Sequence, residues 1–281
     1  MTSDRFPFGA PSTPRPPREP ITGPARVAVV GVYPSALHVR WTLPTWAVER
    51  LDVASHVTAL AIDVEPVVFW DGRDPAAADL VSRWKAAVGF EEGDDDGYHG
   101  HAVGAMNGMS GVAVGERVLA PLGIDPSETF FTDLVPRFFL KRSGGSGSAQ
   151  ANRIDDTYTP FARAAELPAA SLPNRPTPAR LVQLTVTEAA SRLRGEIAGA
   201  GADLLVTLGE EARWAVAILA DDAGGPPTSQ LRCNDSYGLP GRLRIDDYRA
   251  RWVALTHPGN RTNAWRGVHD AWSEHAAQLG G

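Results

Sequence analysis

The sequence predicts an α/β protein in which a parallel sheet carries helices on both faces. Short runs of β-branched and aliphatic residues alternate along the chain with amphipathic segments, and each run ends in turn residues. None of the runs shows strict polar alternation, which is typical of strands that are buried on both faces of a parallel sheet. With 281 residues, 43% of them hydrophobic, the chain is long enough for one or two domains.

Four strands are expected, at residues 26–32, 129–134, 203–208 and 251–256. An additional hairpin is expected at residues 59–70, where two short apolar runs follow each other. The helices are expected at residues 76–87, 187–198, 210–220 and about 263–279. In the last of these, Trp265 and Trp272 fall at helical spacing and are interpreted as core anchors.

Residues 1–24 contain seven prolines and few side chains that could be buried. They predict a Pro/Arg-rich tail that is disordered or extended, or that lies along the domain surface, ahead of a single domain at residues 25–281. A second interpretation makes the tail an arm in which Arg5, Arg15 and Arg18 hold a polyanion. The glycine- and serine-rich run at residues 143–148 predicts a flexible loop.

The composition excludes several classes of protein. Lys plus Arg number 27 against 33 for Asp plus Glu, so a nucleic-acid site would have to be a local basic patch. Residues 131–180 are the stretch in which basic residues outnumber acids. The single cysteine, Cys233, excludes internal disulfides, Cys-rich zinc sites and a four-thiolate iron–sulfur cluster.

The sequence shows no membrane span, signal peptide or convincing metal site, so a cytoplasmic monomer without cofactor or metal is expected. His99 and His101 lie beside the acids at residues 94–96, and this stretch is interpreted as a solvated acidic loop.

The candidate site lies where the predicted strands end. In an open parallel sheet, ligands bind beyond the carboxyl ends of the strands. The first strand runs into Gly31, Tyr33, Pro34 and Ser35. The second ends at Asp133, the third at Leu208-Gly209, and the fourth at His257-Pro258. Each residue alone is equally explained as a turn glycine, a cap or a core histidine, and their shared location is what favours a functional site.

In this order, the motifs resemble the uracil-DNA glycosylase superfamily, as a divergent bacterial-type member. The resemblance covers residues 26 to 276 and includes Ser110-Gly111 at a helix entry, inside a segment at residues 106–122 that is similar to several branches. It implies a three-layer α/β/α sandwich around a central four-stranded parallel sheet. It also implies hydrolysis of the N-glycosidic bond of a damaged or modified base flipped out of DNA, without a cofactor.

The resemblance implies that His257 donates a hydrogen bond to the oxygen of the leaving base. The loop of Gly31, Tyr33, Pro34 and Ser35 would close the pocket, with Tyr33 against the base or the sugar.

The first and second motifs depart from the family. The first normally supplies Asp, Asn or Glu for the attacking water, which this chain lacks at residues 32–34. The second normally ends in Asn, whereas Asp133 offers only acceptors when ionised. An ionised Asp133 suits a base with an exposed amino group, and a protonated Asp133 is the other interpretation.

The last motif departs as well. His257-Pro258 continues into Asn260 and Arg261, where the family often has Ser and a wedging Leu. Arg261 is expected to enter the vacated base stack or to grip phosphate.

Because the first motif lacks this acid or amide, another residue must activate the attacking water. Asp63 and Glu65 are the nearest acids in the chain, although charges flanking a surface hairpin explain at least one of them. Asn107 and Ser110 are candidates for contacts with the sugar–phosphate backbone, and a turn with a helix cap explains them equally well.

Two other functions remain open on the same fold, a nucleoside or nucleotide N-glycoside hydrolase and a non-catalytic domain that binds modified bases or abasic DNA. A Rossmann-type nucleotide binder and a serine hydrolase are disfavoured, since no strand is followed by GxGxxG or GxxxxGK[ST] and no GxSxG is present.

Overall fold

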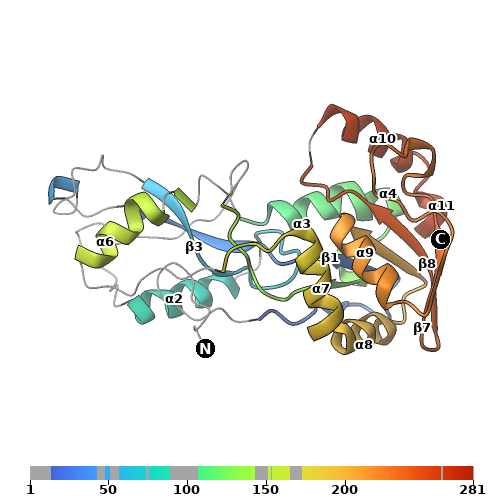
Figure 1. Ribbon diagram of the computed structural model, residues 1–281, viewed down its shortest axis with the longest axis horizontal. Helices are drawn as coiled ribbons and strands as arrows, with labels where there is room; N and C mark the ends of the chain where they lie inside the picture. The colour runs from blue at the N-terminus through green and yellow to red at the C-terminus, as the bar shows by residue number, and fades with distance from the viewer. Residues whose placement is uncertain are drawn as a thin grey trace.

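A computed structural model describes residues 14–42, 48–50, 57–73, 76–88, 107–142, 151–152, 154–164, 173–260 and 262–280. The described residues form a mixed α/β structure with a six-stranded, mostly parallel sheet and a separate two-stranded sheet (Figure 1). The two sheets belong to different parts of the molecule and have different hydrophobic cores.

The main sheet contains the predicted parallel strands. Four neighbouring strands run parallel and are, in spatial order, β4 (Thr129–Asp133), β1 (Val27–Gly31), β5 (Leu204–Leu208) and β8 (Tyr248–Leu255). Every residue of β1, β4 and β5 is buried, as expected for strands covered on both faces.

The expected four-stranded sheet was too small. Beyond β8, the sheet continues with β7 (Gly241–Ile245) and β6 (Asp222–Gly224), which run antiparallel to their neighbours. Apolar and arginine residues alternate in β7, so that Leu243 and Ile245 are buried while Arg242 is exposed. This pattern is typical of a strand with one exposed face, and it contains no uninterrupted apolar run that would mark a strand in the sequence.

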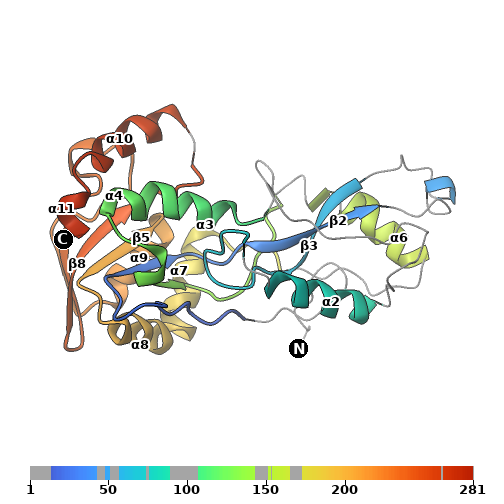
Figure 2. The same ribbon diagram turned by 180° about the vertical axis from the view of Figure 1, so that it is seen from behind.

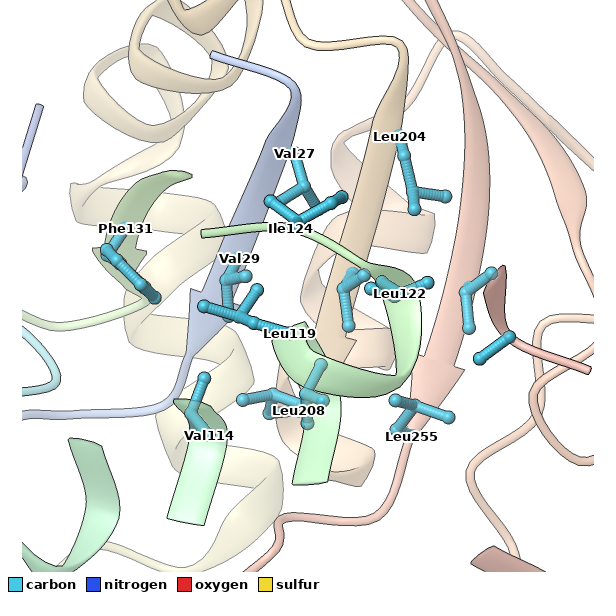
Figure 3. Close-up of a cluster of buried hydrophobic side chains, with 14 of the residues drawn as sticks. Val27, Val29, Val114, Leu119, Leu122, Ile124, Phe131, Leu204, Leu208 and Leu255 are labelled. Atoms are coloured by element: carbon cyan, nitrogen blue, oxygen red, sulfur yellow. The ribbon is translucent and has the colours of Figure 1, made fainter. Parts of the chain in front are cut away.

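Helices pack against both faces of the main sheet. One face carries the continuous helical stretch at residues 109–122, composed of α3 (Met109–Val114), a π-helical turn (Gly115–Leu119) and α4 (Ala120–Leu122). The same face packs against α10 (Asn263–Ser273) and the segment leading into α11 (Ala277–Gly280). Figure 3 shows part of this core, in which Val27, Val29 and Leu204 of the sheet meet Leu119 and Leu122.

The opposite face packs against α7 (Pro178–Glu188), α8 (Ala190–Ala200) and α9 (Glu210–Leu219). The helix expected at residues 187–198 corresponds to α8 and starts within the last two residues of α7, a helix that was not expected. The two helices meet at Ala189, which has a non-helical backbone. The helix expected at 263–279 is likewise divided, into α10 and α11.

A second lobe lies beyond one end of the main sheet, on the left in Figure 1 and on the right in Figure 2. It contains β2 (Ala36–Thr42), β3 (Val57–Val64), α2 (Ala76–Val88), a π-helical segment (Ile154–Tyr158) and α6 (Thr159–Ala164). Its core includes Trp70, Trp84 and Phe161. The chain enters this lobe after β1 and again after β4, the strands that end at Gly31 and Asp133.

The hairpin expected at residues 59–70 is wrong in its pairing. β3 pairs antiparallel with β2 rather than with the residues that follow it. After Glu65 the chain leaves the sheet at Pro66, which has no backbone N–H to donate to a ladder.

Part of the N-terminal tail lies along the domain surface, one of the arrangements expected for it. Residues 14–24 follow the free edge of β4, where Arg18 and Phe131 exchange backbone hydrogen bonds of 2.8 and 2.9 Å. Pairing of backbone groups needs no apolar side chains, so composition did not reveal it, and it covers an open sheet edge. Residues 1–13, with Arg5, and residues 143–148 lie outside the described residues.

No helix in the described part of the chain is long and apolar enough to span a bilayer.

Candidate functional site

The four parallel strands bring the candidate residues to one edge of the sheet. Gly31 lies opposite Asp133 in the register of β1 and β4, and Leu208 lies opposite Leu255 in that of β5 and β8. Three spacings of about 4.8 Å separate β4 from β8, so the strand ends extend over roughly 14 Å. Asp133, the loop after Gly31 and His257 therefore lie along a single edge.

Gly31 is required by a close approach of two side chains. A Cβ atom at this position would lie 2.2 Å from Asp133 Oδ1 and 2.8 Å from Phe69 Cζ. Both distances are shorter than non-bonded atoms tolerate, so only glycine lets the Asp133 carboxyl and the Phe69 ring lie against this strand end.

Gly31→Ala should therefore lower the free energy of unfolding by about 1–3 kcal/mol, as overpacked cores do. Gly195→Ala is the matched control, since nothing lies within 4 Å of a Cβ at this helical position. The control should raise stability by roughly 0.5–1 kcal/mol. Urea unfolding followed by circular dichroism measures both, and a Gly31→Ala protein as stable as the wild type would contradict the crowding.

Asp133 is a buried carboxyl that is protonated at neutral pH. It is 4% exposed, and burial raises its pKa to about 8, with Arg192 opposing the shift and Glu196 adding to it. Arg192 donates to the main-chain carbonyls of Asp133 and Leu134, at 2.9 and 2.7 Å, and so fixes the end of β4. Of the two interpretations of Asp133, the structure favours the protonated one, in which the carboxyl both donates and accepts.

Phe69 is a residue of this edge that the sequence analysis missed. Its φ of 52° is rare for a bulky side chain and marks a locally strained backbone. Gly111 allows this conformation, because a Cβ there would lie 2.3 Å from the carbonyl oxygen of Phe69. The ring packs on Phe131 at 5.6 Å between centroids and forms an apolar wall beside Asp133.

Glu65 is buried beside the same loop. The backbone N–H of Ser35 donates to Glu65 Oε1 at 3.1 Å, while Oε2 is buried without a hydrogen-bond partner among the described residues. Burial raises the pKa of Glu65 to about 8; the Ser35 hydrogen bond opposes the shift and the charge of Asp133 adds to it. Ser35 Oγ also lies 3.2 Å from Ser110 Oγ, so these two hydroxyls are brought together.

The Asp63 carboxylate binds the N-terminal segment of the chain. Its carboxylate pairs with Arg15 at 3.3 Å and accepts its neighbour Val64's N–H at 2.7 Å. Arg15 also donates to the Glu65 carbonyl at 2.8 Å, so the N-terminal segment clamps this strand end. Of the two acids proposed for the water, Glu65 faces the strand ends and Asp63 holds the N-terminal segment.

The side chains of Asn107 and Asn260 form hydrogen bonds with backbone groups. Asn107 Oδ1 accepts the His38 N–H at 2.9 Å, and Asn107 Nδ2 donates to the His38 carbonyl at 3.1 Å, which commits the amide to β2. Asn260 Oδ1 accepts the Thr262 N–H at 3.1 Å, in the turn before α10. Arg261 lies outside the described residues.

His257 is held as a neutral imidazole with its proton on Nε2. The backbone N–H of Gly259 donates to His257 Nδ1 at 3.0 Å, which requires a lone pair on Nδ1. Burial lowers the pKa of His257 to about 4, and the positive charge of Lys141 lowers it further while Glu211 opposes. The group that His257 offers at neutral pH is therefore an Nε2–H donor.

Tyr33 and Pro34 form one wall of the edge. Pro34 is buried, and the Tyr33 ring meets Phe139 edge-on at 5.5 Å between centroids. The Arg175 guanidinium lies 5.7 Å from the centre of the Tyr33 ring and pairs with Glu211. Burial raises the pKa of the Tyr33 hydroxyl.

Among the described residues, no group of three or more His, Cys, Asp or Glu side chains is placed to hold a metal ion. Residues 94–96 with His99 and His101 lie outside them, and Cys233 is a half-buried free thiol. Comparison with models of known protein families and with curated protein sequences gives no match.

Proposed function

We propose that this chain is a DNA N-glycosylase that hydrolyses the N-glycosidic bond of a damaged or modified base flipped out of DNA. The observation that carries the proposal is the hydrogen bond from Gly259 to His257 Nδ1, which leaves an Nε2–H donor at the same sheet edge as the buried Asp133 carboxyl. Together they offer one group for the leaving base and one for reading its edge.

Cleavage of the glycosidic bond leaves an oxocarbenium-like sugar and gathers negative charge on the departing base. A fixed donor aimed at that charge lowers the barrier more in the transition state than in the ground state. His257 Nε2–H supplies such a donor, and its low pKa keeps the imidazole neutral throughout the reaction.

Asp133 defines the class of base. A protonated carboxyl presents one O–H donor beside one C=O acceptor, as the Asn amide of the family does. It therefore matches a base edge with a carbonyl oxygen next to a ring N–H, as in uracil, hypoxanthine and xanthine. Phe69 supplies apolar surface beside the carboxyl, and the Tyr33 ring packs on Phe139 in the loop after β1.

The proposal also assigns the finer architecture. The parallel strands β4, β1, β5 and β8, with their helices, would be the three-layer α/β/α sandwich of the glycosylase superfamily. The strands β6 and β7 and the second lobe would be additions to it.

Local positive charge supports DNA as the partner despite the net charge of −6. The bridge between Leu140 and Asn174 sets Lys141 and Arg175 on adjacent backbones, and the charge of Lys141 reaches His257. A phosphate beside a flipped nucleotide would meet Lys141, whereas Arg175 is already paired with Glu211.

The test is incubation of the pure protein with DNA oligonucleotides carrying uracil, hypoxanthine, xanthine or alkylated bases, followed by alkaline cleavage of abasic sites. We expect abasic product, with an affinity that falls steeply as salt rises because counterions are released. If a control enzyme works and no product forms, the glycosylase proposal is wrong. Salt-independent release of base from free nucleosides would favour a nucleoside hydrolase instead, and a gel shift without turnover would favour a binding domain.

Glu65→Gln should lower turnover by about 10²-fold, on the usual scale of a lost general base. Glu65 is the acid whose carboxyl is buried beside the loop after Gly31, and we propose that it takes the proton of the attacking water. Because the pKa of Glu65 is about 8, activity should rise with pH towards 8 in the wild type and lose that rise in the variant.

The matched control is Asp63→Asn, two residues earlier in the chain and next to the last residue of β3. It should lower the melting temperature by releasing Arg15, yet keep the wild-type turnover of the folded protein. Equal losses of turnover in the two variants would remove Glu65 from the mechanism.

A further inference from the structure

A chain of buried hydrogen bonds links the helical stretch at residues 109–122 to the segment that carries His257. His269 Nε2 lies 2.7 Å from the Arg117 carbonyl oxygen, and His269 Nδ1 lies 3.0 Å from Tyr237 Oη. The backbone N–H of Thr256, the residue before His257, donates to Tyr237 Oη at 3.3 Å. Tyr237 and His269 are 4% and 2% exposed, and the proposed mechanism makes no use of either.

Pro121 explains the first hydrogen bond of this chain, the one from His269 to the Arg117 carbonyl. In an α-helix the carbonyl of Arg117 would accept the N–H of residue 121, but Pro121 has none. A buried carbonyl that loses its helical donor needs another, and His269 Nε2–H supplies it within the π-helical turn.

The direction of every bond in the chain is then fixed. Nε2 faces a carbonyl and must carry the hydrogen, so neutral His269 has its lone pair on Nδ1. Tyr237 therefore donates its O–H to Nδ1 and accepts the Thr256 N–H on its oxygen. Burial lowers the pKa of His269, with the Arg117 carbonyl and Asp270 opposing, which preserves this neutral arrangement.

His269 and Arg117 also hold the chain on the C-terminal side of His257. The His269 ring stacks on Trp265 at 4.7 Å between centroids, and the Arg117 guanidinium lies 5.2 Å from the Trp265 ring centre on which it packs. Arg117 Nη1 also reaches the Pro258 carbonyl at 3.5 Å. The backbone is thus held immediately before and immediately after His257.

We propose that Tyr237 and His269 are positioning residues that hold the His257 segment and thereby aim its Nε2–H at the leaving base. The inference rests on the proposed function for its catalytic meaning, whereas the positioning itself can be measured without any substrate. Tyr237 and His269 touch neither the base nor the sugar in this proposal, and act only through the backbone of residues 256–258.

The experiment compares Tyr237→Phe with Tyr248→Phe. Both substitutions remove one hydroxyl that makes a hydrogen bond, but Tyr248 donates to the carbonyl of Ala202 at 2.7 Å, before β5 at the opposite edge of the sheet. Nitrogen NMR of the His257 ring reports its tautomer, hydrogen exchange reports the Gly259 N–H, and steady-state kinetics with the modified oligonucleotides separates kcat from KM.

In Tyr237→Phe we expect the Gly259 amide to exchange about tenfold faster or more, and His257 to populate its second tautomer. The kcat should fall about tenfold with little change in KM, since orientation rather than binding is lost. Tyr248→Phe should leave all three measurements unchanged. His269→Phe, which keeps a ring against Trp265 but can neither donate to the Arg117 carbonyl nor accept from Tyr237, should reproduce the Tyr237→Phe changes.

If the His257 tautomer and Gly259 exchange in Tyr237→Phe match those in Tyr248→Phe, the positioning proposal is overturned. A wild-type protein that releases no base, but whose His257 tautomer still responds to Tyr237→Phe, would support the positioning and refute the proposed function. The two failures are therefore distinguishable.

Discussion

Replacing His257 with alanine should lower the rate of base release about 10²-fold or more, the usual loss for one donor to developing negative charge. The Nε2–H of a neutral imidazole is the group lost, and the Gly259 hydrogen bond to Nδ1 leaves the ring proton on Nε2 in the wild type. Single-turnover assays with a uracil- or hypoxanthine-containing oligonucleotide measure the rate directly.

The pH dependence of this loss distinguishes a neutral donor from a charged one. Because burial lowers the pKa of His257 to about 4, the imidazole stays neutral at every pH well above that value. The ratio of the wild-type rate of base release to the His257→Ala rate should therefore be the same from about pH 6 to 9. If this ratio instead increases as the pH falls below about 6.5, the ordinary pKa of histidine, the acting group would be an imidazolium.

A histidine elsewhere provides the control. His275 lies after α10 and is exposed, and its Nδ1 faces the Ala271 carbonyl at 3.2 Å. His275→Ala should keep the wild-type rate, and a loss comparable with that of His257→Ala would indicate a general effect on folding rather than chemistry.

The parallel part of the fold was predictable because its strands carry their own signal. β1, β4 and β5 are buried at every position, so their apolar runs can be recognised without knowing their neighbours. β2 and β7 mix apolar residues with arginine and gain stability from partners elsewhere in the chain, which no local pattern reveals.

The candidate site was predictable in position but not in chemistry. Parallel strands must end together, so the common edge of Gly31, Asp133 and His257 follows from the strand assignment alone. The protonation of Asp133 depends on how completely the fold buries it, and the place of Phe69 depends on Gly111, some forty residues along the chain. Such distant contacts require coordinates, as does the pairing of Asp63 with Arg15.

We expect the wild type to lose activity at alkaline pH as Asp133 ionises, and Asp133→Asn should remove this loss. With a pKa of about 8, Asp133 is ionised above that pH and can no longer donate to a base carbonyl. At about pH 9, one unit higher, roughly one-tenth of the wild-type molecules keep the Asp133 proton, so activity on uracil at that pH should be about tenfold lower than that of the Asp133→Asn variant. The asparagine amide donates at any pH, so the variant should stay active there and match the wild type near neutrality within a few-fold.

Glu196→Gln tests the same carboxyl without altering it. The negative charge of Glu196 raises the pKa of Asp133, so its removal should move the alkaline loss of activity to lower pH. Rate profiles of the three proteins between about pH 6 and 10 on one uracil oligonucleotide give the midpoints. An Asp133→Asn protein that is inactive at every pH would show that the carboxylate itself is needed. The preferred substrate would then be a base that presents an amino group, because an ionised Asp133 can only accept hydrogen bonds.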